Sequence, residues 1–375
     1  MMQYKNLITE LMFVDNACNF RCEYCTAPLK PIPVKNGVFT LAESAGEVIE
    51  LDASKDKKLG IRMREHCKRV LEIVPSPILS LIGGELTLIQ GLTDYLIEIS
   101  SSYELIILTT NGSLLDKATI EALSKCKNLL LYISLDGFQY DMNSYRVPSE
   151  KLSNQLLESL EYCLEKEIKV EVQMVLHDRN IELIKAYADY LLQYSKKGYY
   201  IKLIPFPVRW TQGKYSPLLR DLSKLRQLYE EHEYYQDILP PKAYMTNLLG
   251  ILETGHRTTR CYVPYFVNGI DNRGKIKSCP CIPVISSTIH EETEKARASI
   301  EKAKEEYKDR KVNSGFCHTC YEGGWEILNA YLQGTINKNE LQRMQIGKTP
   351  SVLEVLEQIK ERVYKDSFYN SMSVE

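Results

Sequence analysis

The amino-acid sequence predicts an α/β fold in which a partial, open (β/α)6 barrel is followed by a smaller cysteine-rich region. Short apolar stretches typical of strands alternate with amphipathic stretches typical of helices, as expected for βα units and a largely parallel sheet. Six such units fit within residues 1–210, too few for a closed eight-stranded barrel of about 250 residues. Beyond them the pattern changes, and five of the 11 cysteines lie between residues 261 and 320.

The six strands are expected where short runs of leucine, isoleucine and valine occur, because such runs suit a pleated and buried surface. Two of them end at turn-forming pairs, Gly83-Gly84 and Asn111-Gly112. The predicted strands are Ile8–Val14, Ile78–Ile82, Leu105–Thr109, Leu129–Leu135, Val170–Leu176 and Ile201–Phe206. The predicted helices are Leu114–Ser124, Ser153–Lys166, Ile181–Ser195, Leu219–Tyr235, Pro241–Glu253, His290–Lys311 and one beyond Pro350.

These elements divide the chain into four parts. The barrel comes first, and its first connection, at about residues 27–59, is longer than usual and forms a candidate lid or insertion. The four parts are the barrel at residues 1–210, a helical linker at 211–260, a cysteine-rich domain at 261–345, and a C-terminal helix and tail at 346–375.

The composition is that of a folded globular protein. Hydrophobic residues make up 44% of the chain and charged residues 26%, close to the globular average, which excludes wholesale disorder. The 47 Lys and Arg residues balance 49 Asp and Glu residues, so no basic excess points to nucleic acid. No apolar run approaches the roughly 18 residues of a membrane span, and residues 1–16 lack the pattern of a signal peptide. We therefore expect a cytoplasmic protein with neither nucleic acid nor membrane as a partner.

The sharpest motif is a group of three cysteines, Cys18, Cys22 and Cys25, on the loop after the first strand. Without an export signal, disulfides are disfavoured and clustered thiols more often bind metal. A structural zinc site needs four closed ligands, and no histidine or further cysteine follows before His66. Three thiolates suit an iron–sulfur cluster that keeps one iron open for a ligand.

The spacing C-x3-C-x2-C resembles the hallmark of the radical S-adenosylmethionine (SAM) superfamily, and three companion motifs strengthen the resemblance. Gly83-Gly84-Glu85 follows the second strand, Thr110-Asn111-Gly112 ends the third, and Ser134-Leu135-Asp136-Gly137 ends the fourth. All lie at carboxyl ends of strands, where barrel active sites are built. The sequence departs from the family at Leu86, where proline is common.

The resemblance implies how the chain binds its cofactor. Glu85 and its two preceding glycines would hold the methionyl amino group of SAM, and Ser134 with Arg146 would contact its ribose and carboxylate. Tyr24 would lie near the adenine, and the last strand around Ile204 would offer backbone contacts to it. The full predicted cofactor-binding set is Tyr24, Gly83, Gly84, Glu85, Asn111, Ser134, Asp136, Arg146 and Ile204.

The resemblance also implies an activity. A [4Fe–4S] cluster on the three cysteines, reduced by a flavodoxin or ferredoxin, would cleave SAM to methionine and a 5′-deoxyadenosyl radical that abstracts a substrate hydrogen. The protein's part is to place the target C–H bond and to exclude water. The sequence assigns no substrate base or radical relay.

The second cysteine group resembles the SPASM and twitch domains, which hold auxiliary [4Fe–4S] clusters. Cys261, followed by Gly274 and then Cys279 five positions later, resembles the opening of these domains, and Cys317 with Cys320 would complete four thiolates. Five cysteines allow one auxiliary cluster, the twitch arrangement. Cys281 is surplus and could replace Cys279 as a ligand. A four-cysteine zinc site remains the alternative.

The substrate is expected to be a peptide or protein, which the enzyme would oxidise, crosslink or epimerise. The alternative is a small-molecule dehydrogenase that acts on a sugar or cyclitol and passes electrons to the auxiliary cluster. For an epimerase, Cys281 is a candidate hydrogen donor. A hypothesis of another class is a zinc-binding module without catalysis, which predicts a colourless protein indifferent to SAM.

Overall fold

The computed structural model describes most of the chain. The described residues are 4, 6–12, 18–25, 39–42, 48–51, 57–208, 219–257, 259–271, 273–277, 279, 285–309, 320–321 and 323–365.

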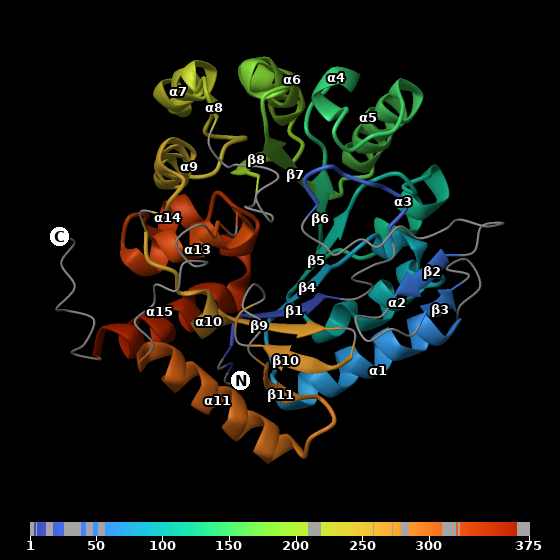
Figure 1. Ribbon diagram of the computed structural model, residues 1–375, viewed down its shortest axis with the longest axis vertical. Coiled ribbons are helices and arrows are strands. Elements are labelled where there is room, and N and C mark those ends of the chain that lie inside the picture. The colour runs from blue at the N-terminus through green and yellow to red at the C-terminus, as the bar shows by residue number, and fades with distance from the viewer. Residues whose placement is uncertain are drawn as a thin grey trace.

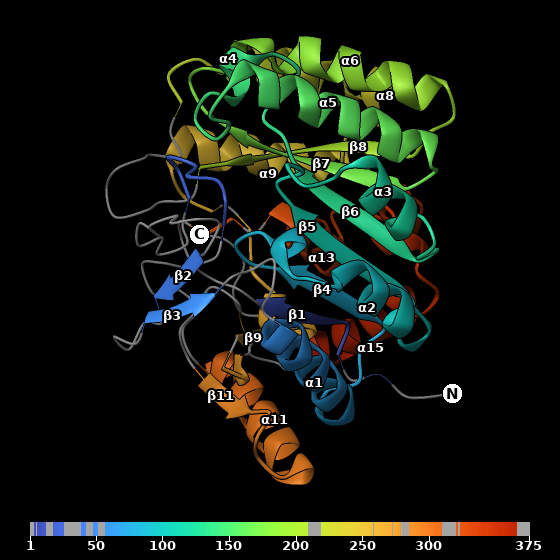
Figure 2. The same cartoon turned by 90° about the vertical axis from the view of Figure 1, so that its right-hand side faces the viewer.

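Six parallel strands form the centre of the molecule and confirm the predicted barrel strands. They follow one another in the sheet in chain order, each paired in parallel with the next, and their helices cover the outer face (Figures 1 and 2). The array ends at its first and last members, which do not pair with each other among the described residues, so the barrel is open. The strands are β1 (Ile8–Met12), β4 (Ile78–Ile82), β5 (Leu105–Thr110), β6 (Leu129–Ser134), β7 (Lys169–Leu176) and β8 (Ile201–Pro207).

Three further strands extend this sheet beyond β1, and the sequence analysis did not predict them. β9 (Val267–Asp271) pairs in parallel with β1, and β10 (Lys275–Lys277) and β11 (Ile285–Thr288) continue it in antiparallel fashion. They are short and carry Asn, Gly, Asp, Lys and Ser, so local propensity gives little strand signal. Part of the cysteine-rich region is thus continuous with the barrel sheet. β2 (Phe39–Ala42) and β3 (Val48–Leu51) form a separate hairpin in the predicted insertion.

The helices lie close to their predicted positions, with shifts that local chemistry explains. The helix predicted from Leu114 begins at Lys117, because the Asp116 carboxylate accepts a hydrogen bond from the Thr119 amide and caps it. The helix predicted over 219–235 is broken at Glu231. The helices beside the barrel strands are α1 (Lys57–Ile73), α2 (Leu92–Ile99), α3 (Lys117–Leu123), α4 (Tyr140–Asn143), α5 (Glu150–Glu165) and α6 (Ile184–Lys196). Those of the later chain are α7 (Ser223–Glu230), α8 (His232–Tyr235), α9 (Lys242–Thr254), α10 (Val263–Phe266), α11 (Thr293–Asp309), α13 (Gly323–Gln333), α14 (Lys338–Leu341) and α15 (Pro350–Lys365).

Helix α13 occupies the open side of the barrel, between β8 and β9 (Figure 1). Its first residue packs closely: a Cβ atom on Gly323 would lie 3.1 Å from both the Cβ of Phe206 and the hydroxyl of Tyr244, a tight approach. The helix is buried almost throughout, and its Leu328 is fully buried. The C-terminal region therefore completes the wall that six strands leave open.

None of the helices that the structure describes is both long enough and apolar enough to cross a membrane.

The turn after β6 has no room for a side chain at Gly137, which predicts a stability defect. A Cβ atom there would lie 2.4 Å from the Sδ and 2.5 Å from the Cβ of Met142, which is fully buried in α4. We expect Gly137→Ala to lower the free energy of unfolding by about 1–3 kcal/mol, because α4 must move. Gly324→Ala is the control, since its Cβ would make only an ordinary 3.5 Å contact with Tyr132. Urea titrations that show equal losses for both variants would contradict this prediction.

Candidate functional site

The candidate site residues gather at the carboxyl edge of the parallel sheet. The cysteine loop follows β1, Glu85 follows β4, Asn111 follows β5, and Asp136 follows β6. Because the carboxyl ends of parallel strands meet at one edge, residues far apart in sequence become neighbours there. Hydrogen bonds between the cysteine loop and the ends of β5 and β6, and from the end of β5 to Glu85, show that they do.

The cysteine loop presents three thiols in different degrees of exposure. Cys18 and Cys22 are half-buried, Cys25 is exposed, and the Cys25 amide donates to the Cys22 carbonyl at 3.1 Å. Burial raises the pKa of Cys22 to about 11, partly opposed by the nearby Arg146 guanidinium, and burial also raises the pKa of Cys18. Nowhere in the described residues are three Cys, His, Asp or Glu side chains close enough to hold a metal ion. A metal centre on this loop would therefore require the thiols to close in and release their protons.

The Gly83-Gly84-Glu85 turn follows β4. Gly83 has φ of +155°, which side chains rarely adopt, so glycine suits this position. Gly84 beside it is half-buried. The Glu85 carboxylate is completely buried and accepts hydrogen bonds from Thr87 and from the end of β5 rather than pointing to solvent.

Asp136 is the centre of a buried polar cluster. Its carboxylate accepts hydrogen bonds from the Tyr24 hydroxyl of the cysteine loop and from the Val175 amide of β7, the latter at 2.9 Å. The Arg146 guanidinium lies 3.7 Å from one carboxylate oxygen, and His177 Nε2 lies 3.8 Å from the other. Burial, with the Asp136 charge beside it, raises the pKa of Tyr24 well above its usual value. Asp136 thus joins the cysteine loop to the ends of β6 and β7.

Two donors of this cluster are left without an acceptor. Arg146 Nε and His177 Nε2 are buried and have no hydrogen-bond partner among the described residues. The Arg179 amide lies 3.2 Å from His177 Nδ1, which assigns the ring proton to Nε2 in the neutral form. Buried donors normally have partners, so two orphans at one edge fit a polar ligand with acceptor atoms.

His177 was missed by the sequence analysis. The sequence signal that could have found His177 is its position directly after β7. The same criterion, a polar residue at the carboxyl end of a strand, selected Asp136 after β6. Of the other predicted residues, Ser134 is the half-buried last residue of β6 and stands opposite Gln173 of β7. Ile204 also stands opposite Gln173, from the β8 side, with its side chain buried in the core.

The second cysteine group is only partly described. Cys261 is half-buried before α10, Cys279 is buried after β10, and Cys320 is half-buried before α13. Cys317 and Cys281 lie outside the described residues.

A buried ion pair joins two of the segments that carry these cysteines. Arg257 pairs with Glu326 of α13 and also donates to the carbonyl of Cys320 at 3.2 Å. The Tyr262 amide, next to Cys261, donates to Asn329 of α13 at 2.8 Å. Helix α13 therefore holds the segment around Cys261 at two points, and Arg257 ties that segment to the backbone of Cys320.

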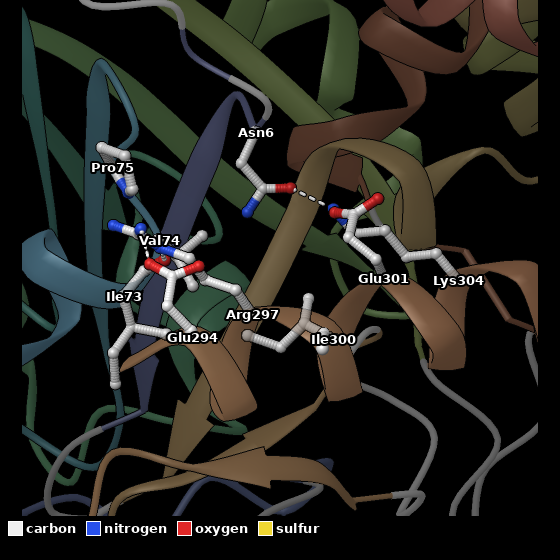
Figure 3. A pocket seen from close by; sticks show the side chains of 10 residues that line it. Asn6, Ile73, Val74, Pro75, Glu294, Arg297, Ile300, Glu301 and Lys304 are labelled. Atoms are coloured by element: carbon white, nitrogen blue, oxygen red, sulfur yellow. Dashed lines mark hydrogen bonds and ion pairs between the residues drawn. The ribbon is translucent and has the colours of Figure 1, made fainter. Parts of the chain in front are cut away.

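A cavity of about 460 Å³ lies between α11 and the segment that follows α1, away from the Asp136 cluster and from both cysteine groups (Figure 3). Its polar lining is engaged in the fold: Arg297 donates to the carbonyls of Glu72 and Ile73, and Lys304 donates to Asn6 at 2.6 Å. It contains none of the predicted site residues.

Comparison with known proteins assigns part of the chain to a family. Residues 12–191 match the family model of the Radical SAM superfamily. Neomycin C epimerase of Streptomyces fradiae is 26% identical over 294 residues, which are 76% of this chain and 81% of that protein. Fe-coproporphyrin III synthase of Methanosarcina barkeri is 25% identical over 174 residues, which are 46% of this chain and 38% of that protein.

Solved structures share the fold at low identity. SuiB of Streptococcus suis has a TM-score of 0.53 at 15% identity, covering 78% of this chain and 66% of that one. The protein anSMEcpe with bound AdoMet has a TM-score of 0.52 at 16% identity, covering 94% of this chain and 99% of that one. The chain thus spans slightly less than two thirds of SuiB and nearly all of anSMEcpe.

The hydrogen bond from Tyr24 to Asp136 predicts that Tyr24→Phe destabilises the protein. Removing the hydroxyl leaves a buried carboxylate with one donor fewer, which costs about 1–3 kcal/mol in unfolding free energy. Tyr145→Phe is the matched control, because its hydroxyl donates to the exposed Asp178 at 3.0 Å. Thermal unfolding of both variants measures the difference, and equal stability would refute it.

The buried Arg257–Glu326 pair predicts a second, larger effect. Glu326→Gln removes the charge that balances a buried guanidinium and should cost about 3–5 kcal/mol. The control is Glu253→Gln, which breaks an exposed pair with Arg226 at 2.7 Å and should cost about 1 kcal/mol or less. Chemical denaturation of the two variants side by side tests the ratio, and a Glu326→Gln loss as small as the control's would show that the pair contributes little.

Proposed function

Because residues 12–191 match the family model of the Radical SAM superfamily, we propose that this protein holds a [4Fe–4S] cluster on Cys18, Cys22 and Cys25 and uses SAM to abstract a hydrogen atom from a substrate carbon. The observation that carries this proposal is the meeting of the three-cysteine loop with the Asp136 cluster at one edge of the parallel sheet.

The donor set suits such a cluster. Three thiols on one loop, with no further ligand group assembled around them in the described residues, match a four-iron cluster with one iron left for another ligand. When bound, the cluster supplies the electron that cleaves SAM to methionine and a 5′-deoxyadenosyl radical. The orphan donors of Arg146 and His177 are suited to acceptor atoms of SAM. Tyr24, which lies on the cysteine loop, is held by Asp136 of the same cluster.

A polar cavity inside the barrel supports hydrogen abstraction from an enclosed group. It measures about 50 Å³, room for a small substituent rather than a whole substrate. Barrel interiors are usually filled by branched apolar side chains, whereas most of the side chains here are polar. Its lining comes from all six barrel strands and the first turn of α13: Glu10, Ser80, Ile82, Thr109, Tyr132, Gln173, Phe206, Gly323, Gly324 and Trp325. Enclosure by α13 would keep water from a reactive intermediate.

The substrate we propose is a peptide or protein. Two proteins of the same fold were solved with peptides: SuiB with its precursor peptide SuiA, and anSMEcpe with Cp18Cys. A narrow cavity suits one side chain of a longer molecule. The second candidate substrate is a small carbohydrate. The similarity to neomycin C epimerase favours it, and the match covers 81% of that protein.

For the second cysteine group we propose one auxiliary cluster on Cys261, Cys279, Cys317 and Cys320, with zinc as the alternative occupant. The shared attachment of the Cys261 and Cys320 segments to α13 supports a common site. A flavodoxin or ferredoxin is the proposed electron donor.

Anaerobic reconstitution followed by iron and sulfide counting tests these proposals. The wild type should bind about eight irons, and a Cys18/Cys22/Cys25→Ala variant about four, with loss of deoxyadenosine formation. A Cys67→Ala variant is the control. Cys67 is buried in α1, so this variant should retain both iron and activity. Deoxyadenosine formation by the triple variant would sink the radical SAM assignment of these cysteines, and four irons falling to none would argue against the auxiliary cluster.

A further inference from the structure

We propose that Glu85 and Asn111 act through their side chains as a brace for the cysteine loop, and that Asn111 tunes the cluster on that loop through an N–H···S hydrogen bond to Cys18. This inference rests on the proposed function, because it assumes a cluster on the three cysteines. It assigns both side chains to positioning rather than to contact with SAM.

The Glu85 carboxylate has little capacity left for a cofactor. Oε1 accepts from the Thr87 amide at 3.1 Å, the Thr87 hydroxyl at 2.5 Å and the Thr110 hydroxyl at 2.6 Å. Oε2 accepts from the Asn111 amide at 2.6 Å. A carboxylate offers about four acceptor sites, and four donors already use this one. Its side chain therefore ties the turn after β4 to the end of β5, with no exposed surface.

The Asn111 side chain links the end of β5 to the cysteine loop by hydrogen bonds. Its Oδ1 accepts from the Ser113 amide at 2.9 Å, and its Nδ2 donates to Asn19 Oδ1 at 2.9 Å. Asn19 in turn donates to the Ser113 hydroxyl at 2.8 Å, which closes a ring through the two asparagine side chains and the hydroxyl and backbone amide of Ser113. Both polar atoms of Asn19, the residue next to Cys18, are thus held by the end of β5.

The same Asn111 amide nitrogen lies 3.8 Å from Cys18 Sγ, within hydrogen-bond distance for sulfur. The Phe20 amide approaches this sulfur as well, at 3.3 Å. Hydrogen bonds to a ligand sulfur favour the more negative, reduced cluster and so raise its reduction potential. Removing the Asn111 donor should therefore lower the potential and weaken the hold on the cluster.

The test compares the holoenzyme with Asn111→Asp and Asn111→Ala. Asn111→Asp keeps the Oδ1 acceptor for Ser113 and removes the Nδ2 donor to both Cys18 and Asn19, whereas Asn111→Ala removes the acceptor as well. Asn128→Ala is the matched control, because Asn128 also braces backbone, donating to the carbonyls of Ser100 and Tyr103 far from the cysteines. The measurements are the EPR-monitored midpoint potential, the rate of iron loss to a chelator, and the equilibrium affinity for SAM.

Both Asn111 variants should show a lower potential and about tenfold faster iron loss, the usual scale for an outer contact of a metal ligand, with SAM affinity changed less than twofold. The control should match the wild type in all three. A tenfold loss of SAM affinity with unchanged potential and iron retention would overturn the brace and make Asn111 a cofactor contact. A wild type that binds no cluster would instead refute the proposed function, so the two failures are distinguishable.

Discussion

The parallel pairing of six strands is the constraint on which the rest of this structure depends. Parallel strands bring all their carboxyl ends to one edge, so each connecting turn delivers its first residues to the same place. The cysteine loop, Glu85, Asn111 and Asp136 come from four different turns and still contact one another or a shared neighbour there. Because the barrel is open, the six strands leave one side of it uncovered, and helix α13 packs there.

Buried carboxylates hold the elements together where the site is built. Asp136, Glu85 and Glu326 are each completely buried, and each joins segments far apart in the chain. A buried charge without partners would cost several kcal/mol, so its partners are constrained in position. The contacts that stabilise these buried charges also orient Tyr24, Asn111 and Arg257 beside the cysteines. In this protein the polar residues near the site serve the fold and the chemistry together.

The parts of the fold that sequence reasoning located best carry strong local patterns. The strand at Ile78–Ile82 was placed without error because an apolar run ends at two glycines. The helix start at Lys117 was misplaced by three residues, since a cap depends on which carboxylate turns back to the chain. β9 was missed because Asn268, Gly269 and Asp271 become strand residues only beside β1. His177 was missed because its importance lies in the neighbours it meets.

The sequence by itself determined the alternation of strands and helices, the three-cysteine loop and the motifs at the strand ends, because these are read from neighbouring residues. Only the tertiary structure decided which groups share a contact. It turned the Glu85 carboxylate toward Thr110, placed Tyr24 on Asp136, and left donors of Arg146 and His177 without an acceptor among the described residues. Such contacts join residues about 25 to 112 positions apart. Their energies depend on burial and distance, which exist only once the chain has folded.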